Sequence, residues 1–261
     1  MDREYLRALL SPLEATKSYR PKLGQGGQRA VSAAEFQKIF GEDPFYQWMG
    51  LDLPEVYIAH RVAGGITSLY RQLGIGCERL LRKILKDTLD LSELDLRWGY
   101  SVEEGGRTRR INLDAHISLA KVANPDVVGR VRNWINAQRQ ARSIAAELTG
   151  VVFEIRQGYK SKDSKRQNAD IISASRAYQN SLLPCMLVLS QQIDSDVRAR
   201  YHNAGWVILT GSLESEALVS TYAFMKDVIG YDLAAFFERN QEAIRQQVHE
   251  VVRTLFQGGD V

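Results

Sequence analysis

The chain has 261 residues, of which 44% are hydrophobic and 25% are charged, and its formal net charge is +3. This composition is ordinary for a globular protein, and the length suits one large domain or one domain with an added lobe. No run of about 18 uncharged apolar residues occurs, and the first twenty residues lack the apolar core of a signal peptide. We therefore expect a cytoplasmic protein without a membrane span. Cys77 and Cys185 lie in apolar patterns, which favours buried thiols over a disulfide framework or a zinc site.

The first part of the chain, residues 1–60, mixes helix-forming and loop-forming stretches, and we expect a helical and loop extension there. After a break at Gly64 and Gly65, apolar residues recur at helical spacing, which predicts an amphipathic helix over residues 66–89. The apolar stripe consists of Leu69, Leu73, Cys77, Leu80, Leu81, Ile84 and Leu85. Glu78 lies at the edge of this stripe, where a structural role as a capping or ion-pairing residue is one interpretation.

A β-hairpin is predicted next, because the turn-forming residues 103–106 separate two alternating runs at residues 94–103 and 107–119. On the second run, the apolar side chains alternate with polar ones. The polar positions are Asn112, Asp114, His116 and Ser118. One face of this strand is therefore expected to pack in the core, and the other to carry a line of polar groups.

The rest of the chain alternates between helix and strand signals. Asn124 and Pro125 are typical of a helix start, and we expect this helix to continue until Gly150. Strands are predicted at residues 151–158, 183–190 and 206–211, with helices between them and a helical C-terminal part that breaks near Gly230. The order predicts an α/β fold with a mixed central sheet flanked by helices. We expect a core domain over residues 61–212 and C-terminal helices over 213–261 packed on it.

Two carboxylates lie on neighbouring predicted strands. Asp114 shares its strand with polar residues at every second position, and Glu154 points away from the core that Phe153 and Ile155 enter. Two carboxylates on one sheet face can hold a hard divalent cation through oxygen. A run of cations between Arg156 and residue 166 follows directly, which suits a phosphate-containing substrate, although such a run is also typical of a solvated turn.

A helix, a hairpin with an aspartate, a strand with a glutamate, a helix and a strand, in this order, resemble the core of PD-(D/E)xK nucleases. The stretch GIGCERLL, residues 74–81, is similar to the first-helix pattern of many type II restriction endonucleases. The stretch SKDSKRQNAD, residues 161–170, is similar to the one that often follows their active-site strand. Residues 60–240 resemble in particular the ApaLI-like restriction endonucleases.

The resemblance implies a role for each residue. Asp114 and Glu154 would bind Mg²⁺, and Glu78 would be an accessory acid. The family pattern has a lysine two residues after the glutamate, where this chain has Arg156, a poor proton acceptor. Either Arg156 acts only through its charge, or Lys160 or Lys162 supplies the catalytic cation. The expected DNA-contacting residues are Lys165, Arg166, Gln167 and Asn168 at a helix start and Arg107, Arg109 and Arg110 near the hairpin turn.

The activity that the resemblance implies is that of a Mg²⁺-dependent type II restriction endonuclease. Such an enzyme hydrolyses double-stranded DNA at a short, palindromic site, within a bacterial restriction-modification system. A homodimer is expected, because a palindromic site mirrors the two-fold symmetry of the protein. Two alternatives stay open at this point. One is a structure-selective nuclease of repair or branched DNA, and the other is a catalytically impaired DNA-binding protein of the same fold.

Overall fold

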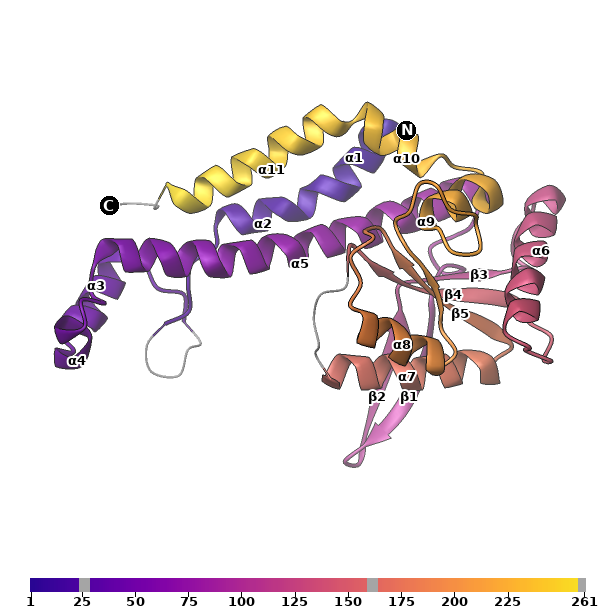
Figure 1. The fold of residues 1–261 in the computed structure, drawn as a ribbon, viewed down its shortest axis with the longest axis horizontal. Coiled ribbons are helices and arrows are strands. Elements are labelled where there is room, and N and C mark those ends of the chain that lie inside the picture. Colours follow the sequence, from indigo (N-terminus) through magenta and orange to yellow (C-terminus); the bar gives the residue numbers. More distant parts are fainter. Residues whose placement is uncertain (24–28, 159–163, 258–261) are drawn as a thin grey trace. The chain divides into compact units, whose positions relative to one another are not determined.

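The computed structural model describes residues 1–23, 29–158 and 164–257, with only the backbone described at residue 104 and at residues 164–168 (Figure 1). The chain divides into two compact units, one formed by Met1–Gly76 with Arg239–Val261 and the other by Cys77–Glu238. The long helix α5, Pro54–Leu89, contributes residues to both units. This division does not coincide with the boundaries predicted after residues 60 and 212. None of the described helices is long and apolar enough to cross a membrane.

The first unit consists of helices. Its elements are α1 (Asp2–Leu10), η1 (Ser11–Leu13), α2 (Glu14–Lys17), α3 (Ala33–Gly41), α4 (Pro44–Trp48), the first part of α5 and α11 (Gln241–Phe256). The two chain ends meet here, because Leu13 packs with Leu69 and Val251 in one apolar cluster. An ion pair of 2.8 Å between Lys17 Nζ and Glu250 Oε1 joins α2 to α11.

The predicted break at Gly64 and Gly65 is wrong, because α5 runs through both glycines and starts at Pro54. Their small size has a packing reason instead. A Cβ atom on Gly65 would lie 2.5 Å from a methyl carbon of Leu255, and one on Gly64 would lie 1.9 Å from the Tyr19 hydroxyl. The glycines thus let neighbouring side chains approach the helix axis.

The second unit contains a four-stranded sheet in the order β3-β4-β5-β6. Its strands are β3 (Ala115–Ser118), β4 (Gly150–Arg156), β5 (Leu182–Val188) and β6 (Val207–Leu209). β3 is antiparallel to β4, whereas the pairs β4–β5 and β5–β6 are parallel. The predicted mixed sheet flanked by helices is therefore confirmed.

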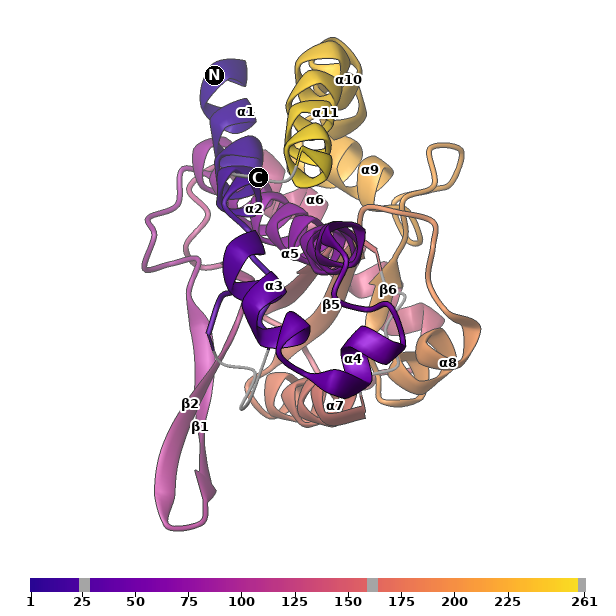
Figure 2. The ribbon, with the colours of Figure 1, turned by 90° about the vertical axis from the view of Figure 1, so that its left-hand side faces the viewer.

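Helices cover both faces of this sheet (Figure 2). On one face, Val152 and Met186 pack with Ala174 of α7 (Ser164–Gln179) and Val197 of α8 (Ser195–Asn203). The other face is covered by α6 (Pro125–Ala141) and by a π-helical segment, η2 (Phe224–Ile229). There the Phe224 ring lies 4.6 Å from that of Trp134 and 5.8 Å from that of Phe153, measured between centroids.

The predicted hairpin is present as a separate two-stranded sheet of β1 (Trp98–Glu104) and β2 (Arg107–Leu113). Its turn uses Gly105 and Gly106 at φ values of 58° and 74°, which glycine adopts without strain. The prediction of one strand over residues 107–119 is wrong. The chain bends at Asp114, and the next residues form β3 in the other sheet.

Two predicted helix boundaries have different outcomes. The cap at Asn124 is confirmed, since its side chain accepts a hydrogen bond from the Asp126 backbone N–H at 2.9 Å. The expected end at Gly150 is wrong, because α6 stops at Ala141 and Gly150 begins β4. A Cβ atom at Gly150 would lie 2.3 Å from the Ile117 carbonyl oxygen, so the glycine serves close strand pairing.

The predicted break at Gly230 is confirmed, and the chain is helical on both sides of it, from Thr221 to Phe256. The expected helix over residues 212–220 is wrong, because that stretch forms turns and ends in a bridge between Ser220 and Thr210. α9 (Thr221–Ala223) leads into η2, and Gly230 follows with a φ of 96° before α10 (Leu233–Arg239). A left-handed glycine is the usual way to end a helix, because no Cβ atom opposes that conformation.

Candidate functional site

Asp114 lies at the bend between β2 and β3, beside the last residues of β4. Its backbone N–H donates a hydrogen bond to the Phe153 carbonyl at 2.9 Å, which extends the β3–β4 ladder by one residue. Its carboxylate Oδ2 accepts the Ile155 backbone N–H at 2.7 Å. The carboxylate thus takes the place of a backbone acceptor where the chain leaves the sheet, and this fixes its position.

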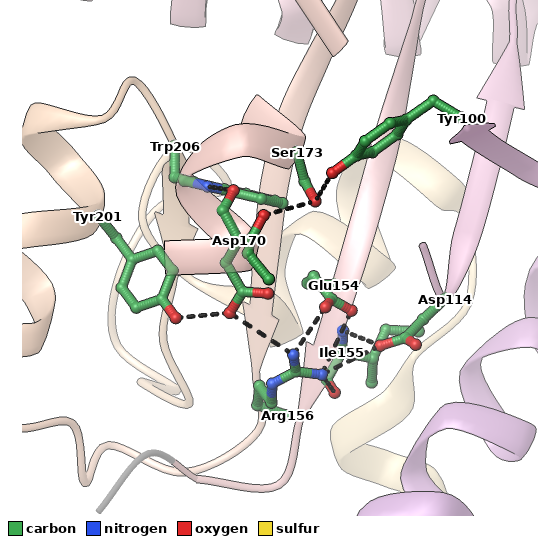
Figure 3. A network of polar contacts seen from close by, with 10 residues as sticks. Tyr100, Asp114, Glu154, Ile155, Arg156, Asp170, Ser173, Tyr201 and Trp206 are labelled. Atoms are coloured by element: carbon green, nitrogen blue, oxygen red, sulfur yellow. Dashed lines mark hydrogen bonds and ion pairs between the residues drawn. The ribbon is translucent and has the colours of Figure 1, made fainter. Parts of the chain in front are cut away.

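Glu154 and Arg156 lie on β4, on the sheet face that α7 covers (Figure 3). Arg156 Nη2 donates to Glu154 Oε1 at 2.7 Å, and its Nη1 lies 3.3 Å from Glu154 Oε2. The same Nη1 lies 3.2 Å from Asp114 Oδ2. One guanidinium group therefore joins the two carboxylates that were expected to bind metal, and the predicted proximity of Asp114 and Glu154 is confirmed.

These three side chains are largely buried, and their protonation reflects it. Burial raises the pKa of Glu154 well above its usual range, and the repulsion from Asp114 adds to this effect against the attraction of Arg156. For Arg156, burial opposes the charge, but the carboxylates of Glu154 and Asp114 outweigh it and raise the pKa. Arg156 thus stays cationic and cannot accept a proton, which supports its expected role through charge alone. Its buried Nε finds no acceptor among the described residues.

A third carboxylate at this site, Asp170 on α7, is absent from the sequence-based prediction. Its Oδ2 lies 3.9 Å from Arg156 Nη2 and accepts a hydrogen bond from the Tyr201 hydroxyl at 2.5 Å. The Trp206 indole N–H donates to its backbone carbonyl at 3.0 Å (Figure 3). A sequence signal for it exists, since Asp170 precedes the buried Ala174 by one helical turn and so lies on the core side of α7.

The network continues on α7 toward the hairpin. Ser173, one turn after Asp170, lies 2.9 Å from the Tyr100 hydroxyl of β1, measured between the two oxygens. A polar contact therefore links the hairpin to the helix that faces the carboxylates.

An open groove of about 790 Å³ adjoins Asp114. Its lining residues are Glu78, Arg82, Leu94, Arg97, Trp98, Arg110, Asn112, Leu113 and Asp114. Arg82 stabilises the bend at Asp114. Its Nη1 donates to the Asp114 carbonyl at 2.5 Å, and its Nη2 pairs with Glu93 at 3.1 Å. Burial raises the pKa of Glu78, and the charge of Asp114 raises it further, in agreement with a site shared by the two carboxyl groups.

The structure places the expected DNA-contacting residues unequally. Arg110 lines the groove and donates from Nε to Asn112 Oδ1 at 3.2 Å. Arg107 and Arg109 are exposed on β2, nearer the hairpin turn, and do not line this groove. Lys160 and Lys162 lie outside the described residues. The other four expected contacts belong to the first turns of α7, where the structure describes the backbone alone; they are Lys165, Arg166, Gln167 and Asn168.

The donor set can be compared with the needs of Mg²⁺. No group of three or more His, Cys, Asp or Glu side chains in the described part of the chain is arranged to hold a metal ion. The oxygens of Asp114 and Glu154 nevertheless both reach one cationic nitrogen, Arg156 Nη1, so they can converge on a single positive charge. Carboxylate oxygen is also the ligand that Mg²⁺ prefers. These two carboxylates therefore fit Mg²⁺ as ligands, and in this structure the guanidinium of Arg156 takes the position between them.

Comparisons of the chain with protein-family models, with curated proteins and with solved structures give no match. The chemistry of the carboxylates, the guanidinium and the groove is therefore the basis on which a function is inferred.

Proposed function

We propose that this protein is a Mg²⁺-dependent endonuclease that hydrolyses phosphodiester bonds of double-stranded DNA at a short specific site. The observation that carries the proposal is the shared contact of Arg156 Nη1 with Asp114 and Glu154, at 3.2 Å and 3.3 Å. It means that the carboxylate at the bend before β3 converges with one from β4, and that the first of them lines an open, arginine-lined groove. The resemblance of the sequence to PD-(D/E)xK nucleases also supports the proposal.

The groove supports a polyanionic substrate. Arg82, Arg97 and Arg110 line it, while Trp98 and Leu94 add apolar surface. Arginine binds phosphate oxygens with two parallel donors and keeps its charge at every physiological pH. A phosphodiester that enters this groove reaches Asp114 and Glu78 among its lining residues.

Each site residue then has a chemical task. Asp114 and Glu154 would hold Mg²⁺, which polarises a phosphoryl oxygen and lowers the pKa of a bound water. Glu78, with its raised pKa, is suited to hold a proton on its carboxyl and release it to a leaving oxygen. Arg156 would leave the position between the two carboxylates when Mg²⁺ binds there, and its charge would then stabilise the developing pentacovalent phosphate without proton transfer.

A second candidate is a DNA-binding protein of the same fold that does not cleave. The guanidinium of Arg156 favours it, because Arg156 already neutralises both carboxylates and stands where the family has a lysine. Asp170 adds a further ion-pair partner and so holds Arg156 more firmly in this position.

Plasmid cleavage distinguishes the two candidates. The protein is incubated with supercoiled plasmids of varied sequence in Mg²⁺, Mn²⁺, Ca²⁺ or EDTA, and DNA binding is measured separately in Ca²⁺. Discrete fragments in Mg²⁺ that disappear in EDTA support the nuclease. We expect Asp114→Asn and Glu154→Gln to lower cleavage at least about 100-fold, as the loss of a group that stabilises transition-state charge does. Asp87→Asn, which removes an α5 carboxylate paired with Lys83, is the matched control.

The possible outcomes separate the alternatives. Binding in Ca²⁺ without cleavage in either active metal indicates the non-cleaving protein, and cleavage gained by Arg156→Lys would then identify Arg156 as the cause. Cleavage of branched but not linear duplexes would indicate a structure-selective nuclease. Full cleavage by both carboxylate variants would refute the site.

A further inference from the structure

An exposed apolar surface lies on the first unit, around α4. Its members are Ile39, Phe45, Trp48, Met49, Leu51 and Leu53, here called the α4 patch. Their exposed fractions range from 38% for Leu51 to 77% for Trp48. Single exposed apolar residues are ordinary on protein surfaces, but a concentration in one short segment marks an interaction surface.

The local fold explains why these side chains stay outside the core. α3 and α4 pack against the start of α5 through their other side chains (Figure 2). The Phe36 ring stacks on Phe40 at 4.3 Å, and Tyr46 lies 4.5 Å from Phe40, both measured between centroids. This small core is complete without the α4 patch.

Backbone contacts hold the patch together. The Asp43 side chain caps α4 by accepting the Phe45 N–H at 2.9 Å, and the Leu51 N–H donates to the Tyr46 carbonyl at 2.9 Å. Gly50, at a φ of 64°, forms the turn between them. The residues after α4 therefore fold back onto the helix, so Leu51 is held beside α4 rather than in a loose tail.

The area of the α4 patch decides which occupant it fits. With roughly 200 Å² for each fully exposed large side chain, the exposed fractions correspond to about 650 Å². That is slightly more than the largest patch of an ordinary monomer, about 300–600 Å². Two such patches pressed together would bury about 1,300 Å², just above the area of about 1,200 Å² at which specific interfaces begin. We propose that the α4 patch is the interface between two copies of this chain in solution.

The apolar residues of the patch agree with a second copy as the occupant, because aromatic residues and methionine are enriched in interface cores. The charged residues next to them in sequence, here called the rim, oppose that contact because they are mostly acidic: Glu42, Asp43, Asp52 and Glu55 against Lys38. In a two-fold contact each rim faces its own copy, so these like charges repel and salt strengthens the dimer by screening them. A contact with a basic surface would instead weaken in salt. The inference does not depend on the proposed nuclease activity.

Sedimentation velocity of the full chain between about 1 and 100 µM tests the proposal. We expect a species of twice the 29.5 kDa chain mass, with a dissociation constant that falls between roughly 0.1 M and 1 M NaCl. Trp48→Gln with Met49→Gln should raise that constant at least about 100-fold, because each change acts on both copies. The matched control is Leu213→Gln, an exposed leucine of the second unit, which should leave it unchanged.

A further variant guards against misfolding as an explanation. Glu42→Gln removes one repelling rim charge from each copy, so it should tighten the dimer about 2–5-fold at low salt, which an unfolded protein cannot do. A monomer throughout the concentration range would overturn the proposal. A dimer that survives Trp48→Gln with Met49→Gln, or one that salt dissociates, would overturn it as well.

Discussion

Replacing Arg156 by methionine should lower the free energy of unfolding of the second unit by about 3–5 kcal/mol at neutral pH. The reason is the burial of the pair: the Arg156 side chain is 10% exposed and that of Glu154 13%, with 2.7 Å between Nη2 and Oε1. Without the guanidinium, the carboxylates of Glu154, Asp114 and Asp170 stay buried next to one another and repel. For a unit of this size the loss corresponds to a fall in Tm of roughly 6–20 °C.

Urea unfolding followed by circular dichroism measures this loss. The deficit should shrink as pH falls through the raised pKa of Glu154, because a protonated carboxyl no longer needs the cation. Lys226→Met, which breaks the exposed ion pair with Asp232 in the same unit, is the control and should leave unfolding unchanged. A loss below about 1 kcal/mol for Arg156→Met would refute the reasoning, because it would show that water solvates the carboxylates as it does in surface ion pairs.

Four other substitutions test further features of the second unit. Tyr201→Phe removes a buried hydrogen bond of 2.5 Å to Asp170 and should lower the free energy of unfolding, measured in urea, by about 1.5–3 kcal/mol. An unchanged free energy of unfolding would mean that water solvates the Asp170 carboxylate. The raised pKa of Glu154 means that its protonated form favours folding, so this stability is complete below the unfolded-state pKa and is lost as pH rises through the folded-state value. Wild-type stability should therefore fall more steeply with pH than that of Glu154→Gln, and parallel profiles would contradict the raised pKa. Gly150→Ala should destabilise the protein by about 1–3 kcal/mol, since its Cβ atom would lie 2.3 Å from a carbonyl oxygen. Gly129 lies on α6 with open space around it, so Gly129→Ala should stabilise the protein by about 0.5–1 kcal/mol. Equal shifts in Tm for the two variants would disprove the close approach at Gly150.

Local signals predicted those elements that depend on backbone preference. The turn at Gly105 and Gly106, the cap at Asn124 and the break at Gly230 each require a conformation or a hydrogen bond that few residue types supply. Features set by distant neighbours were predicted wrongly. The strand over residues 107–119 divides at Asp114, where the backbone N–H donates to the Phe153 carbonyl and the following residues pair with β4 in the other sheet. Alternation along one strand does not reveal this contact.

The candidate site shows the same difference between features set by local sequence and features set by tertiary packing. The expectation that Asp114 and Glu154 approach each other is confirmed, because strand alternation placed both on one face. Asp170 was missed, since its approach to Arg156 depends on how α7 packs on β4. Arg156 opens a run of cations in the sequence, and its side chain turns inward to the carboxylates, which composition along the run does not reveal.

The sequence by itself determined most of the order of helices and strands, though not β3 as a separate strand, together with the types of charged groups available to the site, because these follow from local periodicity and composition. Only the tertiary structure decided which charges are partners. Electrostatic interactions depend on distance in space and on burial, and both arise when α7, β4 and the bend at Asp114 pack together. In the same way, the α4 patch is apolar in sequence, but its exposure follows from a small core that Phe36, Phe40 and Tyr46 complete without it.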